Sequence, residues 1–66
     1  MEPYQQRVVD EKNELDARYE KLLDFLCTDV FKGLPQQEKD RLVRQADIML
    51  KYSLVLGERI AAFGEQ

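Results

Sequence analysis

Apolar and small residues recur along the C-terminal half of the chain at alternating spacings of four and three. The recurring positions are Leu42, Ala46, Met49, Ser53, Leu56, Ile60 and Phe63. This spacing is typical of a helix that packs along a second helix in a coiled-coil-like seam. The same stretch also carries apolar residues outside the seam, among them Leu50, Leu54, Val55 and Ala61. Because one neighbouring helix cannot cover so much apolar surface, the pattern predicts more than one partner for this helix.

The N-terminal half carries a related pattern that is interrupted. Apolar residues follow steps of four, three and four from Leu15 to Leu26. Traced backwards, the stripe meets Glu11 and Lys12 where an apolar residue is due. We therefore expect a first helix over about residues 3–27, with a good packing seam in its second half and a polar interruption in its first half.

The segment between the two patterns predicts a short connection over residues 28–34. Thr28 favours the start of one extra helical turn, and Gly33 suits a left-handed residue at the end of that turn. Pro35 fits the first turn of a second helix, over about residues 35–63. Two helices joined by so short a connection form an antiparallel hairpin. The side chains expected to fill its closed end are Val30, Phe31 and Leu34.

Chain length and cysteine content favour self-association. A single chain of 66 residues buries little core and usually needs a staple or a partner. Cys27 is the only cysteine and histidine is absent, so a disulfide and a Cys/His zinc site are both excluded. We expect Cys27 to be a small buried residue near the turn. The prediction is an all-α, single-domain antiparallel two-helix hairpin over residues 1–66, coiled-coil-like, with a short helical turn in its connection and assembled into a homo-oligomeric bundle.

The second helix is the expected site of assembly. Its small residues Ala46, Ser53 and Gly57 alternate with Leu and Met, which favours close contact between helices. A glycine inside a helix costs about 1 kcal/mol relative to alanine, so Gly57 predicts a close backbone approach. The predicted oligomer interface consists of Met49, Leu50, Leu54, Leu56, Gly57, Ile60 and Phe63.

The sequence lacks the motifs of catalysis and of classical nucleotide binding. It has no histidine for a Ser/His/Asp or Cys/His set, and neither a P-loop nor a GxGxxG motif. The acidic residues Asp10, Glu11 and Glu14 lack EF-hand spacing and read as a solvated helix face. A net charge of -3 argues against a general DNA- or RNA-binding surface. With no long apolar run and no signal peptide, we predict a cytosolic, non-enzymatic protein that needs no membrane, cofactor or metal.

A polar set at the open end of the hairpin is the candidate ligand site. Tyrosine rings can stack on a nucleobase, and arginine or lysine can hold phosphates. Lys51 and Tyr52 lie on a different side of the helix from Leu56, so in an oligomer they can meet another copy. The predicted ligand-binding residues are Tyr4, Arg7, Lys51, Tyr52 and Arg59. The alternative is that the tyrosines form edges of the core and the arginines pair with neighbouring acids.

Two blocks of the sequence, Tyr4–Asp16 and Tyr52–Phe63, resemble a family of very small, mostly uncharacterised proteins encoded by bacteriophages and prophages, including relatives from crAss-like phages. The Leu34–Pro35 restart between the blocks fits the same family, and the resemblance covers almost the whole chain. It implies a viral origin and action in the cytoplasm of an infected bacterium. In architecture alone, an oligomerising helical hairpin is similar to the phage sponges that sequester cyclic nucleotide signals of bacterial immunity. The chain lacks the sponges' sequence motif, so no ligand residue is transferred from them.

Three functions follow as hypotheses. The first is a phage anti-defence protein that sequesters a messenger of the cyclic oligonucleotide type at an oligomer interface. The second is an inhibitor of a host defence complex, such as a CRISPR effector, that docks through its acid-rich face from Asp10 to Asp24 as a mimic of nucleic acid charge. The third is a structural or regulatory phage coiled coil without a ligand.

Overall fold

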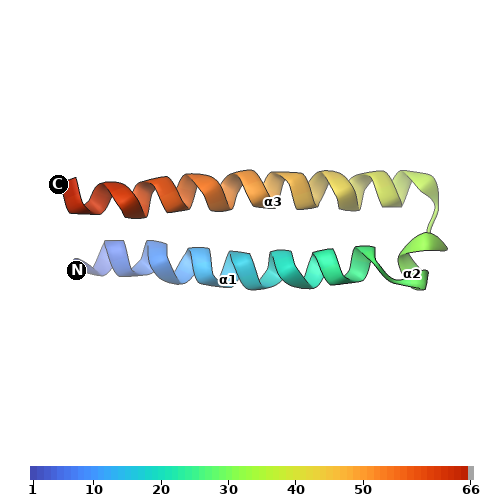
Figure 1. Cartoon of the computed structure of the whole chain (residues 1–66), viewed down its shortest axis with the longest axis horizontal. Helices are drawn as coiled ribbons and strands as arrows, with labels where there is room; N and C mark the ends of the chain where they lie inside the picture. Colours follow the sequence, from blue (N-terminus) through green and yellow to red (C-terminus); the bar gives the residue numbers. More distant parts are fainter. Residues whose placement is uncertain (66) are drawn as a thin grey trace.

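The computed structural model describes residues 1–65 and is helical throughout this range, apart from short turns (Figure 1). Its elements are α1 (Pro3–Leu26), α2 (Asp29–Lys32), α3 (Gln36–Ala62) and the 3-10 turn η1 (Phe63–Glu65). Helices α1 and α3 lie side by side and antiparallel, with both termini at one end, the open end, and α2 at the other, the closed end. The predicted all-α hairpin is thus confirmed.

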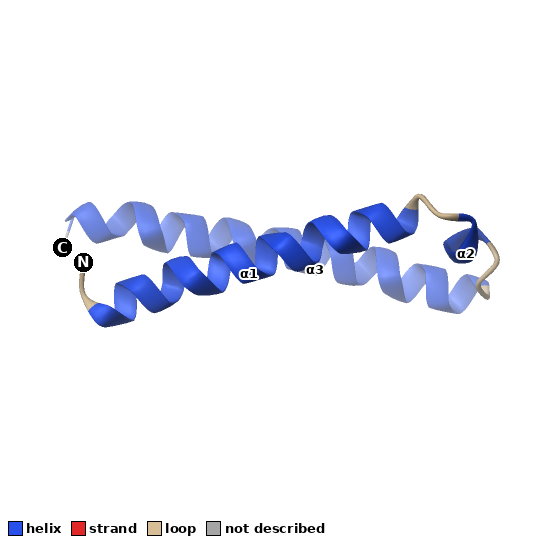
Figure 2. Cartoon of the chain, turned by 90° about the horizontal axis from the view of Figure 1, so that it is seen from below, coloured by secondary structure: helices blue, strands red, loops and turns tan. Residues whose placement is uncertain are grey.

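The hairpin is a thin rod. It measures 48 × 14 × 14 Å, and the 27 residues of α3 account for about 40 Å of its length. Seen from below, α1 and α3 cross at a shallow angle near their middles (Figure 2). This crossing is the geometry that alternating spacings of four and three produce in coiled coils and helix bundles.

Local hydrogen bonds fix both ends of the hairpin. At the open end, the backbone N–H of Glu2 donates to Gln5 Oε1 at 2.8 Å, which satisfies one of the donors left free at a helix start. At the closed end, Thr28 Oγ1 accepts from the backbone N–H of Phe31 at 3.2 Å and so caps α2. Gly33 has φ −84° and ψ −4°, so the predicted left-handed residue is wrong. The chain turns there through Pro35, which adopts an extended conformation.

The closed end is packed less fully than predicted. Phe31 makes an edge-to-face contact with Phe25, with ring centroids 6.2 Å apart. Val30 is 66% exposed, so its predicted role as a plug is wrong. Cys27 is exposed as well, in contrast to the prediction of a buried residue. The reason is geometric, because Cys27 follows the seam residue Leu26 by one position and is rotated about 100° away from the seam.

The core is a single layer between the two helices. Its buried apolar members are Val8, Leu15, Ala46 and Leu56, and of the described side chains only that of Leu56 is completely inaccessible to solvent. Three half-buried side chains pack against this cluster, namely Met49, Ile60 and Phe63. A core of this size leaves much of the apolar surface of α3 exposed.

Candidate functional site

A polar cluster replaces the apolar seam in the middle of the hairpin. Lys12 Nζ donates to Asp16 Oδ2 and to Ser53 Oγ, both at 2.8 Å, and the Ser53 hydroxyl donates to Asp16 Oδ1. Ser53 is 7% exposed, and none of the buried side-chain polar atoms among the described residues lacks a partner. The interruption at Lys12 is therefore a closed network that joins α1 to α3. It pairs these positions across the seam and so favours one register of the two helices.

Acid is expected to weaken this network. The side-chain hydrogen bonds from Lys12 and Ser53 hold the pKa of Asp16 below its ordinary value of 3.8. A carboxyl with a lowered pKa stabilises the fold above its unfolded-state pKa, and this stabilisation is lost as pH falls through the folded-state pKa. We expect the free energy of unfolding to fall below about pH 4. Urea titrations at fixed protein concentration, carried out at neutral and at acidic pH, should show that acid lowers the free energy of unfolding less in Asp16→Asn than in the wild type. An equal decrease in the wild type and in Asp16→Asn would contradict this role of Asp16.

A second contact between α1 and α3 lies within the candidate ligand face. The Tyr52 hydroxyl donates to Glu11 on α1. Glu11 shares one side of α1 with Tyr4 and Arg7, because these residues are spaced by three and four. Arg59 lies two turns after Tyr52 on the same side of α3. The structure therefore brings Tyr4, Arg7, Tyr52 and Arg59 together with Glu11 on one side of the open half, which we call the open-end face.

The open-end face carries an exposed ring and two cations. Tyr52 is 44% exposed, and no ion pair joins Arg7 or Arg59 to another residue in the part of the chain that the structure describes. Tyr4 packs edge-to-face on Phe63, with ring centroids 6.0 Å apart, and so closes the open end. Among the described residues, the Glu11 carboxylate is the acidic group that accepts a hydrogen bond from Tyr52. This face can stack a planar ring on Tyr52 and hold an anionic group between the two arginines.

Lys51 does not join this face. It precedes Tyr52 by one residue, which rotates it about 100° around α3. Its Nζ pairs with Asp47 Oδ2 at 2.8 Å on the outer surface of the helix. Of the five predicted ligand residues, four are thus brought to one side of the hairpin and Lys51 lies apart from them.

The predicted interface residues fall into two groups. Leu56 is fully buried against α1, and Met49, Ile60 and Phe63 pack on the same intrachain core. Leu50 and Leu54 are 41% and 61% exposed, so they remain available to a second chain. A Cβ added at Gly57 would meet Lys12 Cε at 3.5 Å, which is ordinary contact, so packing within the chain does not require glycine there.

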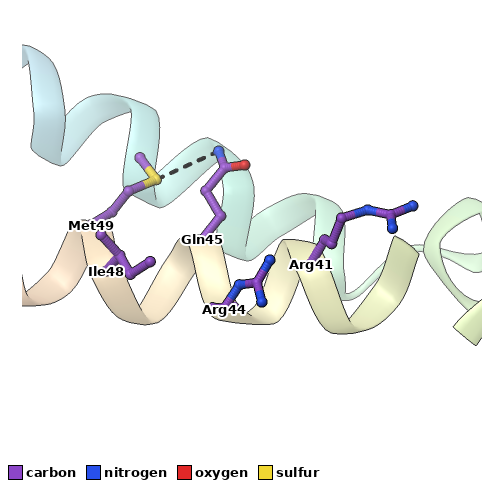
Figure 3. Close-up of a pocket in the computed structure, with 5 residues that line it drawn as sticks. All are labelled: Arg41, Arg44, Gln45, Ile48 and Met49. Carbon is purple, nitrogen blue, oxygen red and sulfur yellow. Dashed lines mark hydrogen bonds between the residues drawn. The ribbon is translucent and has the colours of Figure 1, made fainter. Parts of the chain in front are cut away.

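Sequence reasoning missed a depression of about 340 Å³ on α3. Its lining residues are Arg41, Arg44, Gln45, Ile48 and Met49 (Figure 3). Gln45 Nε2 lies 3.8 Å from Met49 Sδ at its edge. The signal was present in the sequence, because Arg41 and Ile48 are seven residues apart and lie on the same side of α3 as Tyr52 and Arg59. With Tyr52 and Arg59 they continue the open-end face along α3 towards the closed end.

Other kinds of site find no support in the described part of the chain. No group of three acidic or cysteine side chains is placed to hold a metal ion within residues 1–65. Over the same residues, no helix has the length and apolarity needed to cross a membrane.

The fold defines a small, all-helical hairpin protein with aromatic and basic side chains on one side of its open half. The chain belongs to the Sequestin family, whose model matches residues 2–62 and therefore nearly the whole hairpin. Neither the curated proteins nor the solved structures include a match to this chain.

Proposed function

We propose that this chain is a phage-encoded anti-defence protein that binds and sequesters a nucleotide-derived immune messenger, of the cyclic oligonucleotide type, in the cytoplasm of the infected bacterium. The name of its family suggests a sequestering role. The observation that supports the proposal is the open-end face, where an exposed Tyr52 ring shares one side of the hairpin with Arg7 and Arg59. A ring for stacking and two guanidinium groups without ion pairs among the described residues match the base and the phosphates of such a ligand.

Sequestration requires binding without turnover. A protein that only holds its ligand needs neither a nucleophile nor a general base, and we propose that this protein is not an enzyme. It does need enough contact area to compete with the receptor of the messenger. One thin hairpin offers a nearly flat surface, whereas copies that assemble can enclose a ligand between them, so we propose a homo-oligomer as the working form.

Removal of the guanidinium group of Arg59 is expected to weaken ligand binding about tenfold, the loss typical of one charge-assisted contact of roughly 1.4 kcal/mol. The measurement is isothermal titration of the assembled protein with a panel of cyclic di- and trinucleotides. Lys32→Ala is the matched control, because it removes one positive charge from α2 at the far end of the hairpin.

The panel also separates the competing functions. No heat with any cyclic nucleotide would overturn the sequestering proposal. Equal losses in Arg59→Ala and Lys32→Ala would place binding outside the open-end face. A host protein captured in stoichiometric amount, in place of a small molecule, would favour an inhibitor of a defence complex that uses the acidic surface of α1.

A further inference from the structure

Helix α3 carries a second apolar stripe beside the hairpin seam, on the side opposite the open-end face. Its positions repeat the spacings of four and three, and they are Val43, Asp47, Leu50, Leu54, Gly57 and Ala61. Three of its large members, Val43, Leu50 and Leu54, are 53%, 41% and 61% exposed. We call this set the lateral stripe. It has the pattern of a helix-packing surface, and α1 leaves its large members exposed, although Lys12 of α1 lies close to Gly57.

We propose that a second copy of the chain docks antiparallel on the lateral stripe, through a twofold axis that passes α3 near Lys51. This inference names the surface for the self-association in the proposed function, and it does not depend on the identity of the ligand.

The lateral stripe complements itself when it is turned end to end. In one antiparallel register, Leu50 faces the partner's Leu54 and Val43 faces the partner's Ala61. In the same register, Asp47 faces the partner's Gly57, so the glycine leaves room for the Asp47–Lys51 ion pair. A large residue thus meets a small one, or leucine meets leucine, at every level. Such a match of one surface with itself is the requirement for a twofold dimer.

The charges beside the stripe select the antiparallel arrangement. Arg44, which also lines the depression on α3, and Glu58 lie on the outer surface of this helix beside the stripe, 14 residues and therefore about 21 Å apart along the helix. Both are exposed, and neither forms an ion pair with another described residue. The twofold axis brings Arg44 beside the partner's Glu58 and the reverse, whereas a parallel pair would place like charges together. The two Lys51 side chains meet near the axis, where each is neutralised by its own Asp47 at 2.8 Å.

The exposed area of the chain agrees with one such contact. The described chain has 5031 Å² of accessible surface, against about 4,400 Å² for a compact monomer of 7.8 kDa. The excess of roughly 600 Å² is surface that the thin hairpin leaves exposed, and a stable interface buries ~800 Å² of each partner.

The opposite side of α3 does not fit a second copy in the same way. An antiparallel match of that side that places Tyr52 against the partner's Ile48 would bring Arg59 against the partner's Arg41. Like charges would meet twice there, so the dimer leaves the open-end face uncovered and available to a ligand.

Cysteine cross-linking tests the register. In a Cys27→Ser background, Lys51→Cys is expected to form a covalent dimer under mild oxidation, because the two copies of this position meet near the axis. Glu58→Cys lies on the same side of α3 but about 20 Å from its own copy in the antiparallel dimer, so it is expected to remain unlinked. Circular dichroism of each reduced variant checks that the helices are retained. A helical Lys51→Cys protein that does not cross-link, or equal cross-linking of both variants, would overturn the proposal.

Exchange of the charges at Arg44 and Glu58 gives a second test, which does not require a covalent bond between the two copies. Arg44→Glu is expected to weaken dimerisation about tenfold in sedimentation experiments, because repulsion replaces attraction at two symmetric pairs. The double variant Arg44→Glu/Glu58→Arg should restore association, and a double variant that associates no better than Arg44→Glu would contradict the pairing. If Lys51→Cys cross-links but no cyclic nucleotide gives heat in the titration, the dimer is supported and the sequestering function is overturned. If a cyclic nucleotide binds but Lys51→Cys does not cross-link, the sequestering function is supported and this dimer is overturned.

Discussion

Replacement of Leu56 by alanine is expected to abolish most of the helical signal of this protein. Leu56 is the only large side chain in the described part of the chain that is completely buried, and it packs with Val8 and Leu15 at the centre of the core. Leucine-to-alanine changes at such sites cost about 2–5 kcal/mol. A domain of this size has about 3–5 kcal/mol from its core. Far-UV circular dichroism and urea unfolding at one fixed protein concentration would measure the loss.

Leu54→Ala is the matched control for this prediction, because it deletes the same atoms two residues earlier on the same helix. Leu54 is 61% exposed and makes no contribution to the intrachain core cluster. At concentrations at which the wild type is assembled, this variant is expected to keep its helical signal. Its self-association is expected to be weaker, so it should dissociate into single chains at a protein concentration at which the wild type is still assembled. If Leu56→Ala unfolds at the same urea concentration as the wild type, the thin core is not what holds the hairpin together.

The hairpin could be predicted because helical spacing is a local property of the sequence. The steps of four and three through Leu42 and Leu56 fix which side of α3 faces a neighbour, and Pro35 together with a short connection fixes the antiparallel direction. The contact between Tyr4 and Phe63 follows from that arrangement. The exposure of side chains near a helix end was not predictable in this way, because it depends on the exact residue at which the helix ends. One step beyond Leu26 turns Cys27 out to solvent, and Val30, which belongs to the separate helical turn α2, is also exposed.

The candidate site could be predicted only in part. The tyrosines and arginines were visible as residue types, but the role of Glu11 depends on its position opposite Tyr52, which the sequence pattern alone does not reveal. Lys51 and Tyr52 are adjacent in the sequence, yet the helix separates them by about 100°, so they lie on different surfaces. The sequence pattern showed Lys12 only as a polar interruption of the seam. Its hydrogen bonds to Asp16 and Ser53 can be recognised only when the register of the two helices is known.

That network leads to the second large effect. Asp16→Ala is expected to lower the free energy of unfolding by about 1–2 kcal/mol, because it leaves the half-buried Lys12 ammonium group with Ser53 as its remaining partner. For a domain of this length, each kcal/mol lowers the melting temperature by about 4–8 °C. Thermal unfolding followed by circular dichroism at fixed concentration would measure the shift. Asp24→Ala, an exposed acid on the same helix, should leave the melting temperature nearly unchanged.

Replacement of the whole network is expected to act differently from removal of one member. In Lys12→Leu/Asp16→Ala/Ser53→Ala, no charged group remains unpaired in the seam, so stability should return to at least the wild-type value. The seam would then be apolar along its length and would favour one register less strongly, because a single buried polar contact can specify how helices pair. Native mass spectrometry should resolve several assembled species for the triple variant and one for the wild type. A triple variant that is less stable than Asp16→Ala, or that forms one species, would show that the network contributes stability and not register.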